Sequence, residues 1–193
     1  MTTAARMLTV ADFERLPEPE AGKLELDDGV VVLMSPVGKV HGRLARWLGS
    51  VLSEFVEAHG LGEVFVETGY RLLTPRQLVR APDVSFVRAE VVAADAGEVL
   101  FQSPPDLAIE IASTSDRRRR VTTKVDEYLQ GGCRRVWVIW PDRGIVEVHR
   151  AGAPVRVCEP GDVLGSDDAG FEVDSFSLPV SALFGDRASA RGR

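Results

Sequence analysis

The chain has 193 residues, a length that favours one domain because domains commonly hold about 100–200 residues. Its 45% hydrophobic and 27% charged residues exclude a disordered polymer, and its net charge of −6 excludes a protein whose whole surface is a counterion for nucleic acid or anionic lipid. We expect a single domain over residues 1–193, with a core at about 9–184 and a flexible tail at 185–193.

Cysteine content and the N-terminal residues indicate the compartment. The two cysteines, Cys133 and Cys158, are too few for a disulfide framework. The first residues lack the apolar core of a secretory signal, and no uncharged run approaches the roughly 20 residues that span a bilayer. We therefore expect a cytoplasmic protein without membrane contact, in which both cysteines are reduced and structural.

The N-terminal third predicts two helices and a hairpin. A capping-box spacing followed by prolines predicts a short helix over 9–16. An Asp-Gly pair predicts the turn of a hairpin between strands 23–26 and 30–34. Apolar residues at three- and four-residue steps predict a long helix over 41–59, ended by Gly60.

Extended segments dominate the middle of the chain. Strands are predicted over 63–73, 81–87 and 107–112, with a weak helical piece near 90–94. Period-two alternation in the last of these strands places Glu110 on a face that is otherwise apolar. Both faces of that strand are therefore expected to be buried, and one of them contains a carboxylate.

The second half begins with a segment of distinct charge. Residues 116–150 hold nine basic and five acidic residues, which leaves −10 on the rest of the chain, so any nucleic-acid contact must be local. A helix is predicted over 116–130, with Ser115 as its N-cap and two glycines at its end. Short strands are predicted at 136–140, 145–149, 155–158 and 170–173, and residues 178–184 are expected to pack against the core.

Two carboxylates fall among residues predicted to be buried. Asp83 follows Pro82 on one strand, and Glu110 lies on the next long strand. A buried unpaired carboxylate costs several kcal/mol unless a cation or hydrogen bonds compensate it. If the two strands are neighbours, the Cβ atoms lie within about 4.5–8 Å, a span that one divalent cation bridges. Oxygen ligands in an incomplete protein shell suit Mg²⁺ or Mn²⁺ better than zinc.

Lys124 supplies a cation for the same site. It lies on a helical stripe with Val121, Val125 and Tyr128, so its side chain is expected to face the protein body. Beside a bound metal, the ammonium could orient a water or stabilise charge on a phosphate. Two carboxylates on adjacent strands with a lysine from the following helix predict a metal-dependent phosphodiesterase site.

Other interpretations of these residues stay open. Glu110 and Lys124 could form a purely structural ion pair. His41 could be a helix-start or core histidine rather than a base. The four arginines that open the predicted helix form either a solvated face or phosphate contacts beside the site, since a helix start also offers free N–H groups. These arginines are Arg117, Arg118, Arg119 and Arg120.

A set of motifs in chain order resembles the Uma-type restriction-endonuclease family, over roughly residues 9–184. That family is similar in fold to the PD-(D/E)xK nucleases, so the resemblance implies that Asp83 is the motif's aspartate, Glu110 its acidic partner and Lys124 its lysine. The motifs are LELDDGV (24–30), MSP (34–36) followed by His41, APDVSFV (81–87), PDLAIEIAS (105–113) and KVDEY (124–128).

One departure from the family's parent motif concerns the lysine. In that motif the lysine stands two residues after the acid, where this chain has Ala112. The resemblance implies that its role has moved to Lys124 on the helix. Glu25 and His41 also match family positions and are accessory candidates.

Together these observations predict an α/β fold with a restriction-endonuclease-like mixed central sheet flanked by helices, an N-terminal hairpin and C-terminal short strands. The expected function is a Mg²⁺- or Mn²⁺-dependent endonuclease that hydrolyses DNA phosphodiester bonds. A homodimer is plausible, since cutting both strands of a duplex needs two sites. The alternatives are a catalytically inactive nuclease-fold binding or assembly module, and a metal-dependent hydrolase of another phosphate ester.

Overall fold

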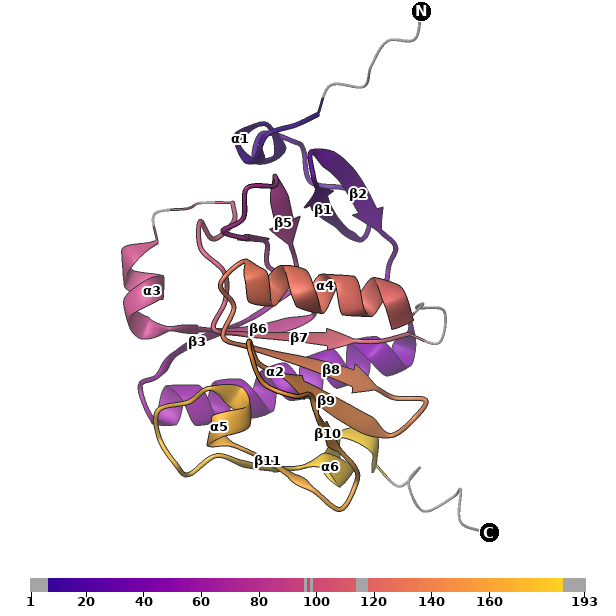
Figure 1. The fold of residues 1–193 in the computed structure, drawn as a ribbon, viewed down its shortest axis with the longest axis vertical. Helices are drawn as coiled ribbons and strands as arrows, with labels where there is room; N and C mark the ends of the chain where they lie inside the picture. The colour runs from indigo at the N-terminus through magenta and orange to yellow at the C-terminus, as the bar shows by residue number, and fades with distance from the viewer. Residues whose placement is uncertain (1–6, 96, 98, 114–117, 186–193) are drawn as a thin grey trace, which may run out of the picture.

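A mixed six-stranded sheet forms the centre of the computed structural model, which describes residues 7–95, 97, 99–113 and 118–185 (Figure 1). The strand order is β10-β9-β8-β7-β6-β3, in which β7 and β8 pair in parallel and the other neighbours pair antiparallel. The predicted mixed central sheet is therefore confirmed. Its strands are β3 (Gly62–Val66), β6 (Val84–Arg88), β7 (Leu107–Ile111), β8 (Arg135–Trp140), β9 (Ile145–His149) and β10 (Arg156–Cys158).

Two long helices cover opposite faces of this sheet. The first, α2 (Lys39–Ala58), packs its apolar stripe on the face that carries Leu107 and Ile109. The second, α4 (Arg118–Gln130), packs on the face that carries Ala108. Because successive side chains of a strand alternate between faces, Glu110 belongs to the α4 side.

A smaller sheet, in the order β2-β1-β5-β4, lies on the same side of the central sheet as α4 (Figure 1). Asp28 (φ 50°) and Gly29 (φ 84°) supply the two positive φ values that a type I′ hairpin turn requires, which confirms the predicted hairpin. The strands are β1 (Lys23–Asp27), β2 (Val30–Met34), β4 (Tyr70–Arg71) and β5 (Leu78–Arg80), and the short helix α1 (Val10–Phe13), with the predicted Thr9–Asp12 capping box, packs beside them.

The predicted strand over 63–73 is wrong. Strand β3 ends at Val66, and Glu67 adopts a φ of 53°, which breaks the extended chain before it continues in the other sheet as β4. Strand β5 was not predicted, and it pairs with both β1 and β4. Asp83 lies immediately before β6 rather than within it.

The C-terminal strands also differ from the prediction. The expected strand over 170–173 is absent from the described chain, because Gly170 (φ 76°) instead ends the helix α5 (Ser166–Ala169). The strands of this region are β11 (Val163–Gly165) and β12 (Ser177–Pro179). The helix α6 (Val180–Phe184) follows, and its buried side chains join the α2 cluster, as predicted.

Other expectations can be checked element by element. Helix α2 begins two residues before the predicted start, and the weak helical piece is α3 (Ala89–Ala94). Ser115 and almost all of the predicted tail lie outside the described residues, whereas α4 ends at Gln130 as predicted. Both cysteines are free and buried. Among the described helices, none is long and apolar enough to cross a membrane.

Candidate active site

Two carboxylates face each other where β6 and β7 meet. The antiparallel register that pairs Val84 with Ile109 sets Asp83 opposite Glu110 when it is extended by one residue. The backbone continues this pairing, since the Asp83 N–H donates to the Ile109 carbonyl at 3.0 Å. Both side chains line one cavity of about 1600 Å³. The neighbouring-strand arrangement expected for them is therefore present.

Asp83 is surrounded by donors. Its Oδ1 lies 2.9 Å from Lys23 Nζ and 3.1 Å from His41 Nε2, and its Oδ2 accepts the Ile111 N–H at 2.7 Å. Burial opposes ionisation, but the close contact with His41 and the charge of Lys23 outweigh it and lower the pKa of Asp83 to about 2. Asp83 is therefore an anion at neutral pH.

Glu110 has a different environment on the same cavity wall. Its Oε1 lies 3.2 Å from Lys124 Nζ and accepts the Tyr128 hydroxyl at 2.8 Å. Burial raises the pKa of Glu110 above its usual value, although the Lys124 ammonium opposes that rise. Burial and the Glu110 charge raise the pKa of Tyr128, which keeps its hydroxyl a donor. Because Lys124 and Tyr128 are one turn apart on α4, both reach the same carboxylate.

Lys124 bridges two acids. Its Nζ also donates to Glu25 Oε1 at 2.8 Å, and Glu25 in turn accepts the Ala81 N–H at 3.3 Å. Burial lowers the pKa of Lys124, but Glu110 and Glu25 outweigh it and raise that pKa above its usual value. The ammonium is thus fixed between β1 and β7. The ion pair with Glu110 that a structural interpretation requires is present as well.

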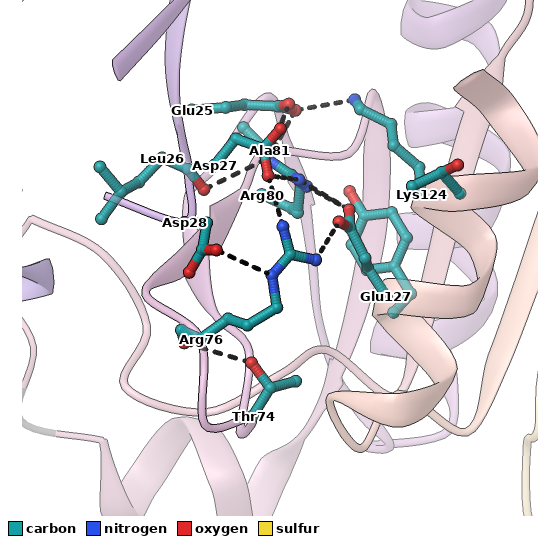
Figure 2. A network of polar contacts seen from close by, with 12 residues as sticks. Glu25, Leu26, Asp27, Asp28, Thr74, Arg76, Arg80, Ala81, Lys124 and Glu127 are labelled. Atoms are coloured by element: carbon teal, nitrogen blue, oxygen red, sulfur yellow. Dashed lines mark hydrogen bonds and ion pairs between the residues drawn. The ribbon is translucent and has the colours of Figure 1, made fainter. Parts of the chain in front are cut away.

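A buried arginine supports Glu25 from behind (Figure 2). The Arg80 guanidinium of β5 contacts Glu127 Oε2 through Nε at 2.9 Å and Nη2 at 2.6 Å, and its Nη1 lies 3.7 Å from Glu25 Oε2. Arg76 adds an exposed contact to Glu127 Oε1 at 3.0 Å. Figure 2 shows Glu25 contacting Lys124 at the top of this network and Glu127 contacting the arginines at the right, with Arg76 below Arg80. The network ties β1, β5 and α4 together around the cavity.

The structure brings Asp83, Glu110 and Lys124 into one cavity with the accessory candidates Glu25 and His41. The arginine segment is divided. Arg118 pairs with Glu147 at 2.8 Å and lies over the Trp140 ring, so it is turned toward β8 and β9. Of the described arginines of this segment, Arg120 alone lines the cavity, Arg119 does not, and Arg117 lies outside the described residues.

Comparison with known proteins assigns the sequence to a family. The Uma2 family, described as "Putative restriction endonuclease", matches residues 10–180. The chain belongs to this family. A crystal structure of "a putative nuclease belonging to DUF820" from Anabaena variabilis ATCC 29413 has 24% sequence identity and a TM-score of 0.78, covering 92% of this chain and 97% of that one. That likeness shows a shared fold. No curated protein matches the sequence.

In this Uma2 family member, Lys124, to which the resemblance assigns the lysine's role, lies on α4. Ala112, two residues after Glu110, is buried in the apolar cluster beneath α4. Lys124 reaches Glu110 from that helix instead. The catalytic roles of Asp83, Glu110 and Lys124 stay predictions.

Sequence reasoning missed Lys23 and Arg80. Period-two alternation along β1 places Lys23 on the same strand face as Glu25, so that signal was available. Arg80 had no comparable signal, because its strand β5 is three residues long and receives its pairing from β1 and β4.

The donor set of this Uma2 site fits a magnesium-type cation. Mg²⁺ is commonly bound through one or two carboxylates, with water and phosphate completing its shell. Asp83 and Glu110 offer such a pair of oxygen ligands, facing each other across β6 and β7. Within the described chain, no three His, Cys, Asp or Glu side chains cluster as metal ligands. A closed zinc site, which takes four protein ligands, is therefore not formed by the described residues.

Proposed function

We propose that the chain is a divalent-metal-dependent endonuclease that hydrolyses phosphodiester bonds of DNA. The observation that carries this proposal is the opposition of Asp83 and Glu110 with Lys124 Nζ 3.2 Å from Glu110, in one cavity. Membership of a restriction-endonuclease family supports the reaction class. Asp83 and Glu110 would hold Mg²⁺ or Mn²⁺, which would supply Lewis-acid stabilisation of charge on the phosphoryl oxygens.

The charge of the inner site favours this reaction. Counted as ions, Asp83, Glu110, Glu25 and Glu127 carry four negative charges, and Lys23, Lys124 and Arg80 carry three positive ones. The remaining single negative charge attracts a divalent cation. The loaded site would then have one positive charge, which matches the single negative charge of a phosphodiester.

Lys124 is the group that can contact the reacting phosphate or water. An ammonium has three N–H donors, and Lys124 Nζ lies 2.8 Å from Glu25 Oε1, 3.2 Å from Glu110 Oε1 and 3.5 Å from Glu110 Oε2. A phosphoryl oxygen or the attacking water would take the N–H that now makes the longest of these contacts. Tyr128 holds Glu110 and Arg80 lies behind Glu25, so neither acid needs to reorganise when Lys124 acts.

A cleavage assay tests the proposal. Supercoiled plasmid and a single-stranded oligonucleotide are incubated with Mg²⁺, with Mn²⁺ and with EDTA. We expect cleavage with either metal, none in EDTA, and none with Asp83→Asn. The matched control is Asp126→Asn on the exposed face of α4, which should cleave as the parent does. Absence of cleavage with every metal, or full activity of Asp83→Asn, overturns the proposal.

One observation favours a second candidate, a nuclease-fold binding module without catalysis. Asp83 is already contacted by Lys23, His41 and the Ile111 N–H, so a cation would have to displace Lys23 from it. The same assay separates the candidates. DNA binding without cleavage in any metal, together with a melting temperature that no metal raises, identifies the binding module.

A further inference from the structure

A row of basic side chains on α2 lines the mouth of the cavity. Lys39, Arg43 and Arg46 are four and three residues apart, which places them on one helix face. At 1.5 Å per residue the row spans about 10 Å, the axial length of about three nucleotides of one DNA strand. None of the sequence motifs pointed to this row.

These three cations differ from those deeper in the cavity. Lys23 and Lys124 each pair with a carboxylate within 3 Å. In contrast, no carboxylate among residues 7–95, 97, 99–113 and 118–185 forms an ion pair with any member of the α2 row, and all three side chains are exposed. Unpaired cations gathered at a cavity favour an anion from outside the protein.

Aromatic side chains line the cavity beside this row. Trp47, the residue after Arg46, is half-buried on the cavity wall, and Phe184 of α6 contributes another ring. A basic groove combined with aromatic side chains is the arrangement by which proteins bind single strands, because the cations follow the phosphates and the rings stack with unpaired bases. A duplex keeps its bases stacked on one another and cannot use such rings without distortion.

The depth of the reactive groups also favours a single strand. The side chains of Asp83, Lys124 and Glu110 are 5%, 12% and 14% exposed, so a phosphate must enter the cavity to reach them. Duplex DNA has a persistence length of about 150 base pairs, and bending it costs several kcal/mol. An unpaired strand is flexible and can enter without that cost.

We infer that the cavity binds an unpaired DNA strand, with Lys39, Arg43 and Arg46 on its phosphates and Trp47 against a base. The inference rests on the proposed function, since it names the form of DNA that the nuclease site would take.

Binding measured in EDTA, where no cleavage occurs, tests this inference. Fluorescence anisotropy compares a labelled single-stranded 20-mer with the same sequence in a blunt duplex. We expect the single strand to bind at least tenfold more tightly. Arg43→Ala/Arg46→Ala should weaken that binding at least tenfold and reduce the log–log salt slope by about 1.4, since each phosphate contact of a single strand contributes about 0.7.

The matched control removes the same charge elsewhere. Arg15→Ala/Arg71→Ala changes two exposed arginines that do not line the cavity, and its affinity should stay within twofold of the parent. A second readout is tryptophan fluorescence, because Trp137 and Trp140 are 0% and 6% exposed and Trp47 is the most accessible of the three. The single strand should quench the parent but not Trp47→Phe.

The outcomes separate the inference from the proposed function. Equal or tighter duplex binding, or equal affinities of the two double variants, overturns the inference even if the enzyme cleaves DNA. Selective single-strand binding through the α2 row without cleavage in any metal supports the inference and overturns the nuclease.

Discussion

At the scale of single residues, two facing carboxylates have opposite electrostatic environments. His41 and Lys23 overcome the effect of burial on Asp83, whose pKa falls to about 2. Burial dominates at Glu110, whose pKa rises although Lys124 is adjacent. Such a separation of pKa values between neighbouring acids is typical of sites where carboxylates have different tasks. Here Asp83 is the firmer anion and Glu110 the group that gains a proton first as pH falls.

The lowered pKa of Asp83 predicts an acid-dependent loss of stability. A carboxyl group whose folded pKa lies below its unfolded value of about 3.8 stabilises the fold above that value, and the contribution disappears as pH falls toward 2. The shift corresponds to about 2 kcal/mol. Urea unfolding at pH 6 and pH 2.5 should show a smaller pH-dependent loss for Asp83→Asn than for the parent. An identical pH dependence of the two proteins contradicts the assignment.

Lys124→Met should affect stability and cleavage together. The change leaves two nearly buried carboxylates, Glu25 and Glu110, without their shared cation, which costs on the order of 3–5 kcal/mol. Unfolding is measured in EDTA and in Mg²⁺, since a bound cation can compensate Glu110 and hide the loss. The Lys124→Met variant should not cleave DNA in EDTA or in Mg²⁺.

Lys124→Arg controls for charge, because it keeps a cation between the two acids and should recover most of the stability. A Lys124→Met variant that melts near the parent in EDTA would show that neither carboxylate depends on the ammonium. A variant that still cleaves would exclude Lys124 from the reaction.

At the scale of elements, the ion pair between Arg80 and Glu127 joins β5 to α4 and so fixes the helix that carries Lys124. Both side chains are buried, so Arg80→Met should cost about 3–5 kcal/mol by leaving Glu127 without its main partner. The double variant Arg80→Met/Glu127→Leu should cost less, because no charge is left unpaired. Denaturant unfolding of the two singles and the double gives the coupling energy. Additive losses would contradict a direct coupling.

The same elements show what the sequence could predict. Helix α2 and the central strands carry apolar residues that recur over several turns or several alternations, so the periodicity of these residues identified the elements from the sequence. Strands β4 and β5 have two and three residues; β5 pairs with β1 and β4 pairs with β5, and no local pattern encodes this pairing. Asp83, Glu110 and Lys124 were predictable because polar groups in buried patterns need partners. The Lys23 contact depends on where the hairpin packs, and the Arg118 contact to Glu147 joins segments 29 residues apart.

At the scale of the whole molecule, the net charge of −6 repels a polyanion such as DNA, whereas the basic side chains at the cavity mouth attract it. Few cations can therefore contact DNA at one time. Three phosphate contacts from Lys39, Arg43 and Arg46 predict a log–log salt slope of about −2 for a single strand. Affinity measured between 50 and 200 mM salt checks this, and a slope several times steeper would show that other cations take part.

Metal binding should couple the site to the stability of the entire fold. Asp83 and Glu110 come together only when β6 pairs with β7, so a cation held by both binds the folded chain and not the unfolded one. At one hundred times its Kd such a ligand stabilises by about 2.7 kcal/mol, which raises the Tm of a domain of this size by about 5–10 °C. Differential scanning calorimetry with and without Mg²⁺ should show this shift for the parent and for Asp126→Asn, and lose it for Asp83→Asn and Glu110→Gln. Asp126→Asn is the control, because this exposed carboxylate does not line the cavity. An equal shift in all four proteins would show that neither Asp83 nor Glu110 holds the cation and would place it elsewhere on the molecule.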